Sequence, residues 1–182
     1  LKNSKYELSN KYFLKAQNRN SRTLLDDYIS KTLDIWSNVE NSNFDQSTYK
    51  LNQLDNRFEN LKKIQNVFLN CFFKTKNTEA LFDRLTTDTK TDFSRYNSFY
   101  AKYLESIGKN QQAKKIILQS LEKFPRNLLL NQYKIDLEKQ QNKFNFNCQK
   151  EQDVVAEILY IAANALSSQS MYQTSNFYLN LS

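Results

Sequence analysis

The chain has 182 residues, of which 40% are apolar and 14% aromatic, and this composition excludes an intrinsically disordered protein. It contains no histidine, which excludes Ser-His-Asp and Cys-His catalysis and histidine-ligated zinc, and its single glycine excludes a Gly-rich phosphate-binding loop. The net charge of +7 is spread evenly, because residues 1–91 hold 15 basic and 11 acidic side chains and residues 92–182 hold 11 and 8. With one glycine and one proline, the chain lacks the turn residues that several β-hairpins need, so an all-α fold is expected.

Residues 1–57 are expected to be helical without an identifiable repeat. A short helix from about Leu8 to Gln17 comes first. The second helix is predicted by residues that recur at three- and four-residue steps: Leu25, Tyr28, Ile29, Thr32, Trp36 and Val39. Trp36 is expected to fill the groove against the next helix, and the polar run from Asn38 to Thr48 is expected to separate the two.

A broad apolar surface marks the next helix, which is predicted from about Leu51 to Phe73. Some of its apolar residues lie near heptad spacing, so a coiled coil is an alternative, but the additional apolar residues favour burial on two sides. A turn at Lys74–Asn77 and a short helix over Thr78–Leu85 follow. Residues 58–93 are therefore interpreted as an imperfect helical hairpin.

Residues 94–127 form the best-defined unit, with two helices joined at Gly108. A glycine after a helical run is typical of a C-cap, because glycine adopts the left-handed conformation without steric cost. Pro125 ends the second helix, since proline disfavours helical geometry in the residue before it. The residues that face inward are apolar or small: Ala101, Leu104, Ala113, Ile117 and Ser120.

A further helix is predicted from Leu128 to about Gln140, and a polar loop over residues 141–152 follows it. The loop carries Phe144 and Phe146, which are expected to be exposed. The helical pattern then resumes near Val154 and continues to the end of the chain, with apolar or small residues at Leu159, Ala163, Leu166, Ser175 and Leu179.

The spacing in residues 94–127 resembles that of the tetratricopeptide repeat (TPR), a helix-turn-helix unit of 34 residues. Counted from Ser94, the family's positions 8, 11, 20, 24, 27 and 32 are occupied by Ala101, Leu104, Ala113, Ile117, Ser120 and Pro125. Asn97 departs from the family pattern, which has a large apolar residue at position 4. Counted from Ala156, positions 4, 8, 11, 20 and 24 are occupied by Leu159, Ala163, Leu166, Ser175 and Leu179.

This resemblance implies a right-handed α-solenoid. Residues 58–93 would be a degenerate repeat, 94–127 the best one, 128–155 a shortened one that contains the loop, and 156–182 a truncated one. The last repeat stops before its closing proline, so either a fragment of a longer solenoid or an unusually short C-terminal helix is expected. In a fragment, Tyr178 and Leu179 would lie on an uncovered apolar face.

The resemblance also implies a function. Bacterial tetratricopeptide proteins of this type are adaptors and assembly factors, so we expect a non-enzymatic protein–protein interaction scaffold without a cofactor or a metal. Positions that face the concave groove in the family carry Arg95, Lys102, Tyr160 and Asn164 here, and these are the expected anchors for an acidic or extended peptide. The alternative is a helical-repeat RNA-binding factor that uses the basic charge.

The two cysteines show no metal-ligand spacing. Cys71 lies within an apolar helix and is interpreted as a core residue, whereas Cys148 lies in the polar loop and is expected to be exposed. No apolar run reaches the length of a membrane span. The sequence leaves a cytoplasmic and a periplasmic location open.

Overall fold

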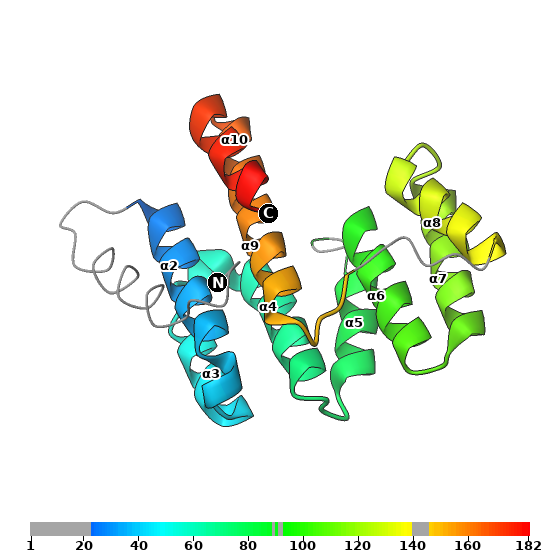
Figure 1. The fold of residues 1–182 in the computed structure, drawn as a ribbon, viewed down its shortest axis with the longest axis horizontal. Helices are drawn as coiled ribbons and strands as arrows, with labels where there is room; N and C mark the ends of the chain where they lie inside the picture. The colour runs from blue at the N-terminus through cyan, green and yellow to red at the C-terminus, as the bar shows by residue number, and fades with distance from the viewer. Residues whose placement is uncertain (1–22, 89, 91–92, 140–145) are drawn as a thin grey trace.

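The computed structural model describes residues 23–88, 90, 93–139 and 146–182, and all regular structure in these ranges is helical, as predicted (Figure 1). The predicted helix from Leu8 to Gln17 lies outside the described residues. The helices are α2 (Leu24–Ser37), α3 (Phe44–Asn52), α4 (Glu59–Phe72), α5 (Thr78–Thr87), α6 (Ser94–Ser106), α7 (Asn110–Lys123), α8 (Leu128–Glu138), α9 (Glu151–Ser168) and α10 (Tyr172–Leu181).

Helices α2 to α8 follow one another in space in the order of the sequence. Each packs against the next, and α6 also contacts α8. A short 3-10 turn at Asn56–Phe58 connects α3 to α4. Figure 1 shows this succession from α2 (blue) on one side to α8 (yellow) on the other. Most packing contacts in this part of the chain therefore join helices that are adjacent in sequence.

Helix α9 breaks this order, because it packs against α2 and forms a hairpin with α10. In Figure 1 it lies in the middle of the molecule, whereas α8 lies at the far side. The expectation that residues 156–182 stack as a repeat directly after residues 128–155 is therefore wrong. Helical periodicity identifies the apolar face of α9, but it does not specify which helix covers that face.

The predicted helix from Leu51 to Phe73 is not continuous: it spans the end of α3, a 3-10 turn at Asn56–Phe58 and α4. Helix α3 begins at Phe44, inside the run expected to be a connection, because the Asn43 side chain accepts a hydrogen bond from the Gln46 amide at 2.9 Å. It ends at Asn52, and the Asp55 carboxylate accepts a hydrogen bond from the Arg57 amide at 2.8 Å before α4 begins. The break also removes the coiled-coil alternative, since neither helix is long enough for several heptads.

Three helical hairpins end their first helix with the same cap. At Gly108 (φ 79°) the next amide, of Lys109, donates to the Leu104 carbonyl at 2.8 Å, which confirms the predicted glycine cap. Two non-glycine residues take the same left-handed conformation after α4 and α9, namely Lys74 (φ 52°) and Ser170 (φ 62°). The matching hydrogen bonds are Thr75 N to Asn70 O at 2.9 Å and Met171 N to Leu166 O at 3.0 Å.

The core runs from α2 through α4 and α6 to α9. Trp36 is almost fully buried between α2 and α4, where its indole Nε1 donates to Gln65 Oε1 at 2.7 Å and its ring meets Phe72 edge-on. This confirms that Trp36 packs against the following long helix. Buried tryptophan needs a partner for its N–H, and Gln65 supplies one.

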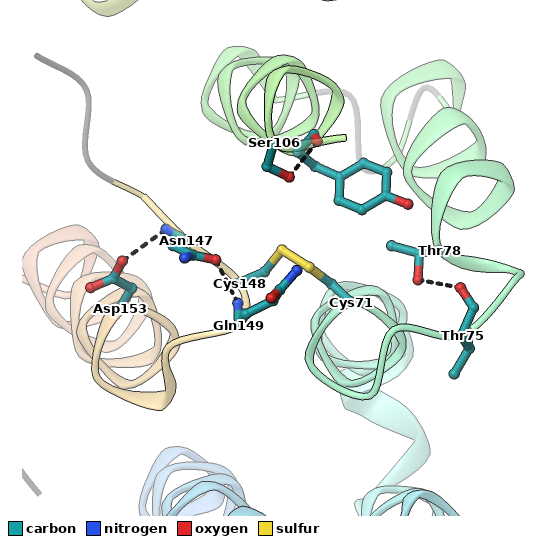
Figure 2. The surroundings of a disulfide bond; sticks show 9 residues. Cys71, Thr75, Thr78, Ser106, Asn147, Cys148, Gln149 and Asp153 are labelled. Atoms are coloured by element: carbon teal, nitrogen blue, oxygen red, sulfur yellow. Dashed lines mark hydrogen bonds between the residues drawn. A yellow bond between two sulfur atoms is a disulfide. The ribbon is translucent and has the colours of Figure 1, made fainter. Parts of the chain in front are cut away.

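The segment before α9 is held to α4 by a disulfide between Cys71 and Cys148, 77 residues apart in sequence (Figure 2). Both cysteines are buried, so the expectation that Cys148 is exposed is wrong, whereas Cys71 is a core residue as predicted. Phe146 is also buried, against the expectation, because its ring lies between those of Phe68 and Phe99. Phe144 lies outside the described residues.

Candidate functional site

Three of the four predicted anchors line one cavity, which lies between α4, α6 and α9 and has a volume of about 410 Å³. Arg95 comes from α6, and Tyr160 and Asn164 come from α9. We refer to this space as the central cavity; its full lining is Leu61, Ile64, Phe93, Ser94, Arg95, Tyr96, Glu157, Tyr160, Ile161 and Asn164.

Helix α9 presents its side of the central cavity through residues three or four apart. Glu157, Tyr160 and Asn164 lie on one helical face at this spacing. The start of α9 is fixed by Asn147, whose amide donates to Asp153 Oδ2 at 2.8 Å and whose side chain accepts from the Gln149 amide at 2.9 Å (Figure 2). Together with the disulfide, this turn fixes the position of the first residues of α9 relative to α4.

Arg95 holds the two sides of the central cavity together. Its Nε donates to Glu157 Oε2 at 2.5 Å, and its guanidinium lies 4.1 Å from the centre of the Tyr160 ring. Glu157 is 1% exposed and the Arg95 side chain 35% exposed. Arg95 was expected to meet a partner's carboxylate, and the structure shows that it already pairs with a carboxylate of its own chain.

Glu157 is buried where α2, α6 and α9 meet. Its Oε1 is buried and accepts no hydrogen bond from the residues that the structure describes. Burial raises the pKa of Glu157 to about 7, against the opposing effects of Arg95 and the Tyr96 hydroxyl. The charge of Glu157 in turn contributes to raising the pKa of Tyr28 on α2, after the larger effect of that tyrosine's own burial.

Asn164 lies at the exposed rim of the central cavity. Its Nδ2 donates to the Tyr160 carbonyl at 2.8 Å, and its Oδ1 is an acceptor without a partner among the described residues. Phe93 is exposed at the opposite wall. The rim thus combines a neutral hydrogen-bond acceptor with an apolar ring.

Lys102, the fourth predicted anchor, lies outside the central cavity. Its Nζ pairs with Glu105 Oε2 at 3.2 Å, one turn away on α6, and the same carboxylate accepts a hydrogen bond from the Tyr133 hydroxyl of α8 at 2.7 Å. The Lys102 side chain is mostly buried in this contact between α6 and α8. Arg95 and Lys102 therefore belong to two different ion pairs rather than to one site.

Of the residues assigned to repeat packing, all but Gly108, Pro125 and Leu179 are buried at helix contacts. Gly108 forms the turn described above, Pro125 follows the end of α7, and the buried members are Ala101, Leu104, Ala113, Ile117, Ser120, Leu159, Ala163, Leu166 and Ser175. The Ser175 hydroxyl donates to the Ala163 carbonyl at 2.8 Å, which shows how closely α10 approaches α9. Leu179 on α10 is 43% exposed.

Two other hollows contain charged residues that are paired at the surface. One lies beside α4 and α5, with Lys63 3.1 Å from Asp88, and the other beside α2 and α3, with Lys50 2.9 Å from Asp34. The central cavity differs from both because it contains a buried carboxylate with one unpaired oxygen. Its walls from α4, Leu61 and Ile64, were not predicted as site residues, since apolar periodicity does not indicate which helices α9 faces.

In the described part of the chain, no group of three or more Cys, Asp or Glu side chains is placed to hold a metal ion. No helix in these ranges is long and apolar enough to cross a membrane. No protein-family model, curated protein or solved structure matches the chain.

Proposed function

We propose that the chain is a non-enzymatic interaction scaffold or adaptor that binds a protein or peptide, built as a right-handed α-solenoid of tetratricopeptide-like repeats of the bacterial type. Support comes from the shared cap of the three hairpins and from the small residues buried at the helix contacts. The absence of histidine from the sequence favours a binding role over catalysis.

The observation that carries this proposal is the composition of the central cavity. Its walls offer Leu61, Ile64 and Ile161 to an apolar side chain, and its rim offers hydrogen-bonding groups to the main chain of a peptide. An extended segment would place one apolar side chain inside and direct an amide N–H to Asn164 Oδ1. The Arg95 guanidinium, which keeps part of its surface exposed, would meet a carbonyl or carboxylate oxygen of the same segment.

The ion pair with Glu157 makes Arg95 a weaker anchor for acidic residues than a free arginine. Since its charge is already compensated, the apolar side chain is expected to dominate affinity. An acidic residue in the ligand would be a secondary contact.

The test is a photo-crosslinking amino acid placed at residue 93 of the whole chain, with residue 49 as the control. Phe93 and Tyr49 are both exposed aromatic residues, but only Phe93 lines the central cavity. We expect partner proteins to be captured from position 93 and not from position 49. Substituting Asn164→Ala should then reduce capture while the thermal melt stays unchanged, because this side chain is exposed.

Equal capture from both positions would remove the central cavity as the binding site. Capture of RNA, with an affinity that falls steeply as salt increases, would favour the alternative function of a helical-repeat RNA-binding factor.

A further inference from the structure

Helix α10 carries no charged residue, and no Lys, Arg, Asp or Glu occurs anywhere from Ile158 to Ser182. Each of the helices α2 to α9 contains at least one charged residue. The whole chain carries a net charge of +7. The end of the α9–α10 hairpin is therefore an uncharged region on a basic protein.

Helix α10 is also apolar on its open side. Ser175 faces α9, and at about 100° per residue Phe177 and Leu181 lie on the opposite side of the helix. Phe177 is 59% exposed and Tyr172 62% exposed. An apolar helix side is typically covered by another element, yet α9 is the main neighbour of α10 in the described structure (Figure 1).

We propose that α10 is the surface through which two copies of this chain form a homodimer. A two-fold interface places each residue near its own counterpart, so the surface must be complementary to itself. A lysine or glutamate at the two-fold axis repels its copy. The polar residues of α10 are amides and hydroxyls, which both donate and accept hydrogen bonds and so pair with themselves: Gln173, Thr174, Asn176 and Asn180.

The distribution of charge also supports α10 as the dimer interface. Two copies that each carry +7 repel one another, and this repulsion is weakest where the approaching surface itself has no charge. Added salt screens the remaining repulsion without weakening apolar contacts. The dimer should therefore become tighter as salt increases, which is the opposite of the behaviour of nucleic-acid binding.

The experiment is sedimentation velocity of the whole chain over a range of protein and salt concentrations. We expect a concentration-dependent dimer, and a monomer for the double variant Phe177→Lys with Leu181→Lys. Leu128→Lys on α8 is the matched control, because Leu128 is 85% exposed but lies on another helix, and it should leave the dimer intact. Thermal melts of the monomeric variant establish that it remains folded.

A charge-pairing experiment separates a direct interface from an indirect effect. Phe177→Lys and Phe177→Glu should each be monomeric alone and should form a heterodimer when mixed, because opposite charges then meet across the two-fold axis. A wild-type chain that stays monomeric, or a dimer that survives the double variant, overturns the proposal. A monomer that binds phosphatidylcholine vesicles through Phe177 also overturns it and assigns α10 to a membrane surface. The inference is independent of the function proposed for the central cavity.

Discussion

Phe146 lies flat against Phe99, with ring centroids 3.7 Å apart and ring planes 7° from parallel. Phe68 of α4 completes the contact, at 5.4 Å from Phe146. This stack joins the segment before α9 to both α4 and α6. It therefore holds the returning α9–α10 hairpin to the helices that precede it in sequence, and with them the wall of the central cavity.

Removing the Phe146 ring should destabilise the whole fold. Phe146→Ala deletes a buried aromatic side chain, and such substitutions cost about 3–5 kcal/mol because a cavity remains. Urea unfolding at equilibrium measures the loss. Leu128→Ala serves as the control, since Leu128 is largely exposed, and equal midpoints for the two variants would contradict the packing described here.

Loss of the disulfide should lower stability by a comparable amount. The bond closes a loop of 77 residues, and the chain-entropy relation gives about 4.5 kcal/mol for a loop of that size. The Cys71→Ala, Cys148→Ala double variant should melt at a lower temperature than the oxidised chain. A reducing agent should lower the melting temperature of the wild type and have no effect on the variant; an effect on both would point to a different cause.

Glu157 should make stability depend on pH between about 4.5 and about 7. Its folded pKa of about 7 is higher than its usual value of 4.5, so the folded state binds the proton more tightly than the unfolded state. The stabilisation is fully present below pH 4.5 and is lost as pH rises through 7, with a total of up to about 3 kcal/mol at 1.36 kcal/mol per pKa unit. Glu157→Gln should flatten this part of the stability curve.

The raised pKa of Asp153 also makes stability depend on pH. Because Asp153 is present in both the wild type and Glu157→Gln, the difference between their stability curves isolates the contribution of Glu157. Denaturant unfolding at several pH values provides the two curves. If the free energies of unfolding of the two proteins run parallel between pH 4.5 and 7, the pKa of Glu157 does not change on folding and the prediction is wrong. Arg95 loses its carboxylate partner in the variant, so the slope rather than the absolute stability is the informative quantity.

The left-handed turns give a pair of opposite predictions. Gly108→Val should cost about 1–2 kcal/mol, because a β-branched residue is strained at φ 79°, and no atom lies within 4 Å to add a steric clash. Ser170→Gly should stabilise the fold slightly, since it relieves the same strain at φ 62°. Thermal melts compare the two, and a destabilised Ser170→Gly would mean that the serine side chain contributes more than its backbone strain costs.

The local structure of the hairpins could be predicted from the sequence because it depends on residues close together in the chain. Gly108 determines its turn by its own conformational freedom, and the apolar positions around it identify the two inner faces. Apolar periodicity does not indicate the separation of α3 from α4. It depends on Asn43 and Asp55, whose side chains accept hydrogen bonds at the start of α3 and of the 3-10 turn before α4.

The return of α9 could not be predicted, since it depends on contacts between residues that are far apart in the sequence. Two cysteines 77 residues apart give no indication of their pairing. A weak signal was present in the alternation Phe144-Asn-Phe146-Asn-Cys148, because a two-residue period is typical of an extended segment with one buried side. The central cavity was only partly predicted for the same reason: its α9 residues were identified, but their α4 neighbours were not.

The bond between Cys71 and Cys148 also keeps α9 tethered beside the face of α2 against which it packs. If the contacts of α9 open, the helix stays at an effective concentration of roughly millimolar order near that face and rebinds before it can diffuse away. A ligand that needs the same face displaces α9 only if the ratio of its concentration to its Kd exceeds the ratio of this effective concentration to the intrinsic Kd of α9. Cleavage of the backbone between residues 73 and 146 would not release the helix either, because the two fragments would migrate as one molecule until a reducing agent separated them.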